Sequence, residues 1–230
     1  MSSAPRLPRR WTGGAEPTAD LLAAHGILGT SPIAHDPKGP LLVAGIGTRQ
    51  VLPLLVAAKS LCHSLGRGRV ALVDDGTLTA EDRGLLAHHL DDPVIHTARA
   101  ENAPFPDGFG WAALAVITGR HQADYRIFLD LEFVTAEISD QVREALARNR
   151  SFLGPDARGA IGLAAIGAGP AEARALVTRF PKERIEAPDA PRRFAWTLAL
   201  NEPGAVELPA SIGVQATPET VLQVVAGLPR

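Results

Sequence analysis

The sequence is poor in cysteine, in aromatic residues and in net charge, and each shortage excludes a class of protein. Cys62 is the only cysteine among 230 residues, which excludes disulfide frameworks and cysteine-rich zinc clusters and is typical of a reducing cytoplasm. Aromatic residues make up 5% of the chain, too few for a platform that stacks nucleic-acid bases. A formal net charge of -2 provides no basic field for nucleic acid or an anionic membrane.

Long apolar runs are also missing. No stretch approaches the roughly 18 consecutive apolar residues that a membrane-spanning helix needs. Residues 1–10 are basic, but no apolar block follows them as it would in a secretory signal. We therefore expect a cytoplasmic protein that has no transmembrane segment and does not bind nucleic acid.

The hydrophobic content, 46%, is sufficient for one sizeable core, and it is arranged as an alternation of strands and helices. After a Pro- and Gly-rich segment that ends at residue 40, short apolar runs alternate with amphipathic patterns. They predict strands at 41–46, 69–73, 94–96 and 126–134, and helices at 51–65, 80–90, 111–118 and 138–149. This alternation indicates right-handed βαβ units, and hence an α/β domain with a mostly parallel sheet flanked by helices.

The remaining residues complete the predicted domain. We expect a flexible or irregular segment over 1–40 and a single domain over 41–230. Its second half predicts a strand at 159–166, a helix at 171–180, a strand or short helix at 194–200 and a terminal helix around 221–225.

The most informative stretch is an apolar run, residues 70–73, that ends in Asp74, Asp75 and Gly76. A short uninterrupted apolar run is typical of a strand buried on both faces of a parallel sheet. The two acids then lie at the carboxyl end of the strand, where open α/β sheets bind polar ligands. Gly76 allows a ligand to approach the backbone, and Thr79 with Asp82 predicts a capped helix directly afterwards.

A second pair of carboxylates, Asp130 and Glu132, follows an apolar run farther along the chain. Residues two apart on a strand point the same way, so the pair is expected to share one face. Two carboxylates on one side of a strand end are suited to a hard cation such as Mg²⁺ or Mn²⁺ bound to a diphosphate. The alternative is that both are solvated residues at the end of a short strand.

Three stretches, residues 47–60, 74–82 and 125–132, resemble the nucleotide-sugar glycosyltransferases of the GT-A fold. The likeness covers about residues 41–150 and implies a single GT-A-like, Rossmann-related domain, in which 41–150 bind the nucleotide and 151–230 form a short acceptor side. It implies that Thr48 and Arg49 line the base pocket and that Asp74, Asp75 and Gly76 contact the nucleoside. It also implies that Asp130 and Glu132 hold Mn²⁺ or Mg²⁺, and that the partners are a nucleotide-sugar donor, such as a UDP-sugar, and an acceptor that the likeness does not identify.

Two departures from the family pattern leave alternatives open. Glu132 stands where the family has a second aspartate, and His121 is the last histidine, whereas many members use a later histidine as a third metal ligand. No catalytic base is indicated. One alternative is a GT-A-like protein that has lost catalysis and serves as a binding or assembly partner. The other is a Rossmann oxidoreductase, which Gly45 and Gly47 suggest but Gln50, at the third glycine position of the dinucleotide fingerprint, disfavours.

Overall fold

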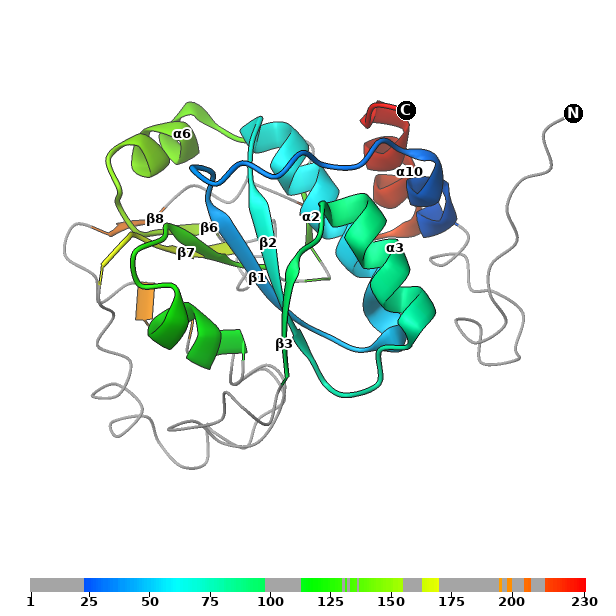
Figure 1. Ribbon diagram of the computed structural model, residues 1–230. Coiled ribbons are helices and arrows are strands. Elements are labelled where there is room, and N and C mark those ends of the chain that lie inside the picture. The colour runs from blue at the N-terminus through cyan, green and yellow to red at the C-terminus, as the bar shows by residue number, and fades with distance from the viewer. Residues whose placement is uncertain are drawn as a thin grey trace, which may run out of the picture.

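The computed structural model describes residues 23–97, 113–129, 131, 133–135, 137–154, 163–169, 195, 198–199, 205–207 and 214–230. Over these residues the chain forms three layers, with a central sheet between helices (Figure 1). The elements, in chain order, are η2 (Gly26–Gly29), β1 (Leu41–Ile46), η3 (Thr48–Gln50), α2 (Val51–Leu65), β2 (Arg69–Asp74), α3 (Ala80–Leu90), β3 (Val94–Thr97), the π-helix η4 (Val116–Arg120), β4 (Arg126–Phe128), β5 (Phe133–Val134), α6 (Asp140–Ala147), β6 (Phe152–Gly154), β7 (Leu163–Ile166), β8 (Val206–Glu207), β9 (Val214–Gln215) and α10 (Pro218–Gly227).

The described residues form a seven-stranded sheet in the order β3-β2-β1-β4-β7-β6-β8. The first four strands of this order are parallel neighbours, β7 runs antiparallel to both β4 and β6, and β6 and β8 are parallel. The predicted mostly parallel sheet is thus confirmed. Because β1, β2 and β3 are parallel, their carboxyl ends meet at one edge of the sheet, the lower edge in Figure 1.

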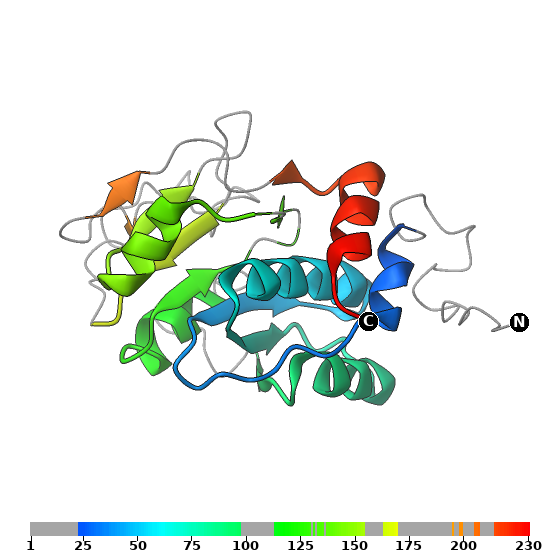
Figure 2. The same ribbon diagram turned by 90° about the horizontal axis from the view of Figure 1, so that it is seen from above.

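Alternate residues of the strands fill two separate cores. On β1, Leu42, Ala44 and Ile46 pack under the helices α2, α3, α6 and α10, whereas Leu41 and Val43 pack on the opposite side against residues 113–117. This is the period of two that a strand imposes on its side chains. Seen from above, α10 and η2 lie side by side next to α2 (Figure 2). The helical layer that contains α2 therefore includes both an early segment of the chain, η2, and a late one, α10.

The predicted strand at 126–134 is wrong in its extent. β4 ends at Phe128, the N–H of Leu129 still donates to the Val43 carbonyl at 2.9 Å, and Leu131 lies in a turn. β5 pairs instead with β9 in a separate two-stranded sheet. Leu131 lies in a turn but packs against the core, as an apolar residue of a strand would. The apolar pattern therefore did not reveal the turn.

The second half of the chain differs most from the predictions. The expected strand at 159–166 is present as β7, which is antiparallel, while residues 155–162 lie outside the described part. The expected helix at 171–180 lies outside it too, whereas the described residues of 194–200 are helical. Strand β6 was not predicted. The terminal helix is longer than expected because Thr217 caps it and Pro218 occupies its first position.

Candidate functional site

Two loops come together at the carboxyl edge of the sheet, one after β1 and one after β2. The strands are paired so that Ile46 lies beside Asp74, and the chain turns away from both at the same level. The N–H of Asp75 donates to the Ile46 carbonyl at 3.0 Å, and the N–H of Thr48 donates to Oγ1 of Thr77 at 3.0 Å. These bonds join the two loops into one surface.

Gly47 is placed where the loops are closest. Its N–H donates to Oε1 of Gln50 at 2.8 Å, which closes the turn that begins α2. A Cβ atom at this position would come within 2.9 Å of Oγ1 of Thr77 and nearer still to the Asp75 carboxylate. The position therefore requires glycine for its lack of a side chain, since its φ of -126° suits any residue.

Asp74 organises the loop after β2 from inside. Its side chain is 3% exposed, and Oδ1 accepts from the N–H groups of Gly76 at 2.8 Å and Leu78 at 3.3 Å. The other oxygen pairs with the guanidinium of Arg83 on α3. Gly76 has a φ of +94°, a conformation that glycine adopts without strain. The buried carboxylate thus fixes the course of residues 75–78.

Asp75, in contrast, is exposed at the rim of this loop. Oδ1 of its carboxylate accepts from the N–H of Thr77 at 2.9 Å and from the Thr77 hydroxyl at 2.6 Å. Arg49 is also exposed on the neighbouring loop. A cation and an anion therefore face solvent on two adjoining loops, beside the exposed backbone of Gly76.

Asp82 links the first loop to the start of α3. The predicted helix cap is confirmed: Oγ1 of Thr79 accepts from the N–H of Asp82 at 3.2 Å, and Oδ2 of Asp82 accepts from the N–H of Thr79 at 2.9 Å. The same Oδ2 accepts from the Thr48 hydroxyl at 2.8 Å, and Asp82 is fully buried. The sequence predicts Asp82 only as a capping residue. Its contact with Thr48, 34 positions away, follows from the parallel pairing of β1 and β2.

The two predicted metal ligands, Asp130 and Glu132, lie outside the described residues. Their neighbours show how the chain approaches this segment: β4 runs parallel to β1, and Leu129 continues the pairing. β4 therefore runs toward the edge where the two loops meet, and its pairing with β1 stops at Val43, before the end of β1 at Ile46. Leu131, between the two acids in the sequence, lies in a turn, while the shared strand face and the role as metal ligands both stay predictions for residues outside the described part.

Within the described part of the chain, no three histidine, cysteine, aspartate or glutamate side chains gather to hold a metal ion. Among the same residues, no helix has the length and apolar content to cross a membrane. The sequence did not indicate that Thr77 and Arg83 belong to the candidate site. Both follow the acids at short spacing, and only the folded loop shows that they bond to them.

No protein-family model matches the sequence, and no curated protein matches it. Among solved structures, the chain is similar to the glycosyltransferase GlyE of Streptococcus pneumoniae TIGR4, with a TM-score of 0.51 and 14% identity over 74% of this chain and 45% of that one. The chain thus spans less than half the length of GlyE. The expected fold is confirmed, since the chain has the GT-A-like α/β fold of glycosyltransferases.

Two further solved structures are similar over most of their length. An active-site mutant of LgtC has a TM-score of 0.43 and 14% identity, and the match covers 73% of this chain and 72% of LgtC. A protein from Desulfovibrio desulfuricans G20, named as a nucleotide-diphospho-sugar transferase, has a TM-score of 0.42 and 10% identity over 74% of this chain and 79% of its own.

Proposed function

We propose that the protein is a glycosyltransferase that binds a nucleotide-sugar, such as a UDP-sugar, together with a divalent cation and transfers the sugar to an acceptor hydroxyl. The observation that carries the proposal is the meeting of the loops after β1 and β2 at the carboxyl edge of the sheet. The two loops are hydrogen-bonded to each other there, and β4, which precedes Asp130 in the sequence, runs parallel to β1 toward the same edge. The glycosyltransferase fold supports the proposal.

The described loops provide the groups that a nucleoside needs. The exposed carboxylate of Asp75 can accept hydrogen bonds from two ribose hydroxyls, and the guanidinium of Arg49 can donate to a base carbonyl or a phosphate. Gly76 leaves the backbone open to a ring lying against it. Asp74 acts as a positioning residue in this proposal, because its carboxylate oxygens already accept hydrogen bonds from Gly76, Leu78 and Arg83. Thr48 likewise contributes through its backbone position, since its hydroxyl donates to Asp82.

The divalent cation belongs with Asp130 and Glu132 in this proposal. Carboxylate oxygens are the ligands that Mg²⁺ and Mn²⁺ prefer, and a bound cation supplies neutralisation of the charge on a leaving diphosphate. The support for this part of the proposal is the direction of β4, which runs parallel to β1 toward the carboxyl edge and ends shortly before Asp130 in the sequence.

The proposal is tested by thermal unfolding with UDP, GDP or NAD, each with and without Mn²⁺. We expect UDP to raise the unfolding midpoint only when Mn²⁺ is present, because the cation would neutralise the charge of the diphosphate beside the carboxylates of Asp130 and Glu132. Asp130→Ala should abolish the Mn²⁺-dependent increase, while Asp140→Ala, which removes an exposed acid from the start of α6, should preserve it. Stabilisation by NAD alone would instead identify a dinucleotide oxidoreductase.

Catalysis is tested separately, by the release of UDP from UDP-glucose or UDP-galactose in the presence of Mn²⁺. Slow release without an added acceptor is expected of an active transferase, through transfer to water. Binding of UDP with no release from either donor, and none after addition of sugar acceptors, would favour a protein that has kept the pocket and lost catalysis.

A further inference from the structure

A cavity of about 190 Å³ lies on the opposite side of the molecule from the proposed nucleotide loops. Because α2 follows β1 and runs back across the sheet, its last residues lie at the amino edge, near the top of Figure 1. The cavity is formed by this end of α2, by the turn after it, by residues 30–34 and by the segment after α10. Its lining consists of Thr30, Ser31, Pro32, Ile33, Ala34, Lys59, Cys62, His63, Gly66, Arg67, Gly68, Leu228 and Pro229.

The lining combines basic and apolar side chains. Lys59, His63 and Arg67 bear charge or can take it up, and the lining of this cavity contains no aspartate or glutamate. A neighbouring cavity of similar volume is lined by neither lysine nor arginine. The two cavities share His63 and Leu228, so Lys59 and Arg67 give the first one its basic character.

Lys59 is 1% exposed, and its ammonium group has only neutral partners among the described residues. Nζ lies 2.8 Å from Oγ1 of Thr30, 3.3 Å from the Thr30 carbonyl, 2.8 Å from the Ser31 carbonyl and 2.9 Å from Nδ1 of His89. None of these atoms belongs to a carboxylate. A buried ammonium group without an opposite charge is costly, and burial lowers the pKa of Lys59 to about 8. An anion in the adjoining cavity would supply the missing charge.

We propose that this cavity is a second ligand site, which takes a small organic anion with a carboxylate or phosphate group and a short apolar body. Arg67, exposed in the turn after α2, bonds to the anionic oxygens, and the buried charge of Lys59 in the lining attracts them. The apolar body lies against Pro32, Ile33 and Leu228.

Ligand binding at this site ties together segments that are distant in sequence. Ser31 donates its N–H to the Pro229 carbonyl at 2.8 Å, and Ile33 donates to the His89 carbonyl at 3.1 Å. A ligand packed against Ser31, Ile33 and Pro229 therefore contacts the segment that joins η2 to β1, and it does so next to both α3 and the end of α10. The site is independent of the proposed nucleotide site, and its occupation is measured without nucleotide.

The test is a titration of the whole chain with propionate and with methyl phosphate at constant ionic strength, followed by calorimetry and by thermal unfolding. Propionamide and propylammonium are neutral and cationic probes of similar size. We expect saturable binding and a raised unfolding midpoint with both anions, and no response to the neutral or cationic probe. An equal response to propionamide, or no saturable response to either anion, would overturn the proposal.

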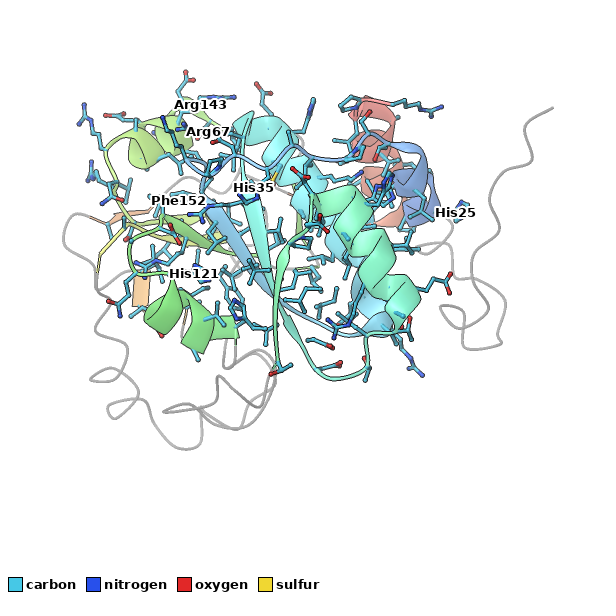
Figure 3. All side chains as sticks on the ribbon, in the orientation of Figure 1. His25, His35, Arg67, His121, Arg143 and Phe152 are labelled. Carbon is cyan, nitrogen blue, oxygen red and sulfur yellow. The ribbon has the colours of Figure 1, made fainter. Side chains whose placement is uncertain are left out.

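Arg67→Ala assigns the binding to this cavity. Arg67 is exposed, so the variant is expected to fold, and loss of its charge-assisted hydrogen bond should weaken binding about tenfold. The matched control is Arg143→Ala. The Arg143 guanidinium donates to the Ser64 carbonyl at the same end of α2, but Arg143 is not part of the cavity lining. The labels of Arg67 and Arg143 mark neighbouring positions in Figure 3. Unchanged affinity in Arg143→Ala supports the site. Equal weakening of anion binding in both variants would show that the anion responds only to the local positive field. That result would contradict a specific site in this cavity.

Discussion

The guanidinium of Arg83, on the first turns of α3, pairs with the buried carboxylate of Asp74 at the end of β2. The pair crosses the loop that carries Asp75 and Gly76, so it sets the distance between the strand and the helix on either side of the proposed nucleoside pocket. Asp74 is 3% exposed and Arg83 is 43% exposed. Removing the arginine therefore leaves a buried negative charge whose remaining hydrogen bonds, among the described residues, come from the N–H groups of Gly76 and Leu78.

We expect Arg83→Ala to lower the free energy of unfolding by about 1–3 kcal/mol, the usual cost of leaving a buried charged group partly unpaired. Urea denaturation measures the change. Arg148→Ala is the control, since Arg148 pairs with Glu144 on the surface of α6 with both side chains more than half exposed, and should change stability by less than about 0.5 kcal/mol. Similar losses of unfolding free energy in the two variants would show that the pair of Asp74 and Arg83 stabilises the fold no more than a surface ion pair does.

Gly47→Ala should disturb the pocket without disturbing a helix or strand. The new Cβ would collide with Oδ2 of Asp75, so the carboxylate must move, at a cost of about 1–3 kcal/mol by the usual penalty for overpacking. Nucleotide affinity should fall with it. Gly84→Ala provides the contrast, because Gly84 lies within α3 with open space around it and alanine favours a helix by about 1 kcal/mol. A Gly47→Ala variant of normal stability and affinity would contradict the proposed close contact.

The buried pair of Lys59 and His89 predicts that stability falls in mild acid. Burial, and after it the neighbouring charges of Lys59 and His88, lower the pKa of His89 from 6.5 to about 4. Between pH 6.5 and 4, the imidazole of His89 is thus mostly protonated in the unfolded chain and mostly neutral in the folded chain. The free energy of unfolding should decline through this window by up to about 1.4 kcal/mol per pH unit.

Denaturation at several pH values tests this expectation. His89→Gln keeps an acceptor for Lys59 but does not titrate, so the decline between pH 6.5 and 4 should become shallower. His88→Gln, which changes the exposed neighbour, should retain most of the decline. If both variants follow the pH profile of the unmodified chain, the acid sensitivity lies in other groups.

Arg126 holds two parts of the second core together. It is fully buried, and its guanidinium donates to the carbonyls of Ile117 at 2.8 Å, Gly167 at 2.5 Å and Gly169 at 2.9 Å. A lysine ammonium is a point charge and does not reproduce this fork. We expect Arg126→Lys to lower the unfolding free energy by about 2–4 kcal/mol, while Arg148→Lys on the surface has little effect. A loss below 0.5 kcal/mol in Arg126→Lys would contradict the assigned role.

The first half of the fold was predictable because its signals are local. β1 and β2 are continuous apolar runs, α3 begins at a capping pair, and all appear where the sequence places them. The second half depends on contacts between distant residues. β7 runs antiparallel between β4 and β6, and nothing in its four apolar residues specifies that direction.

The candidate site was predictable in position and not in detail. A strand ending in two acids indicates a polar edge, but which acid is buried depends on Arg83 and on the turn at Gly76. The sequence presents Asp74 and Asp75 as equivalent, whereas the folded loop buries one and exposes the other. The separation of β4 from β5 was missed for a similar reason, since Leu131 is apolar although it lies in a turn.

The shared carboxylate of Asp82 has a consequence for the energetics of binding. Because it accepts from Thr48 and Thr79 at once, the loop after β1 cannot shift without loosening the start of α3. A ligand entering between these loops meets a surface that is already ordered, so little conformational entropy is lost on binding. The amide hydrogens of Thr48 and Thr79 should therefore exchange slowly even before any ligand is added.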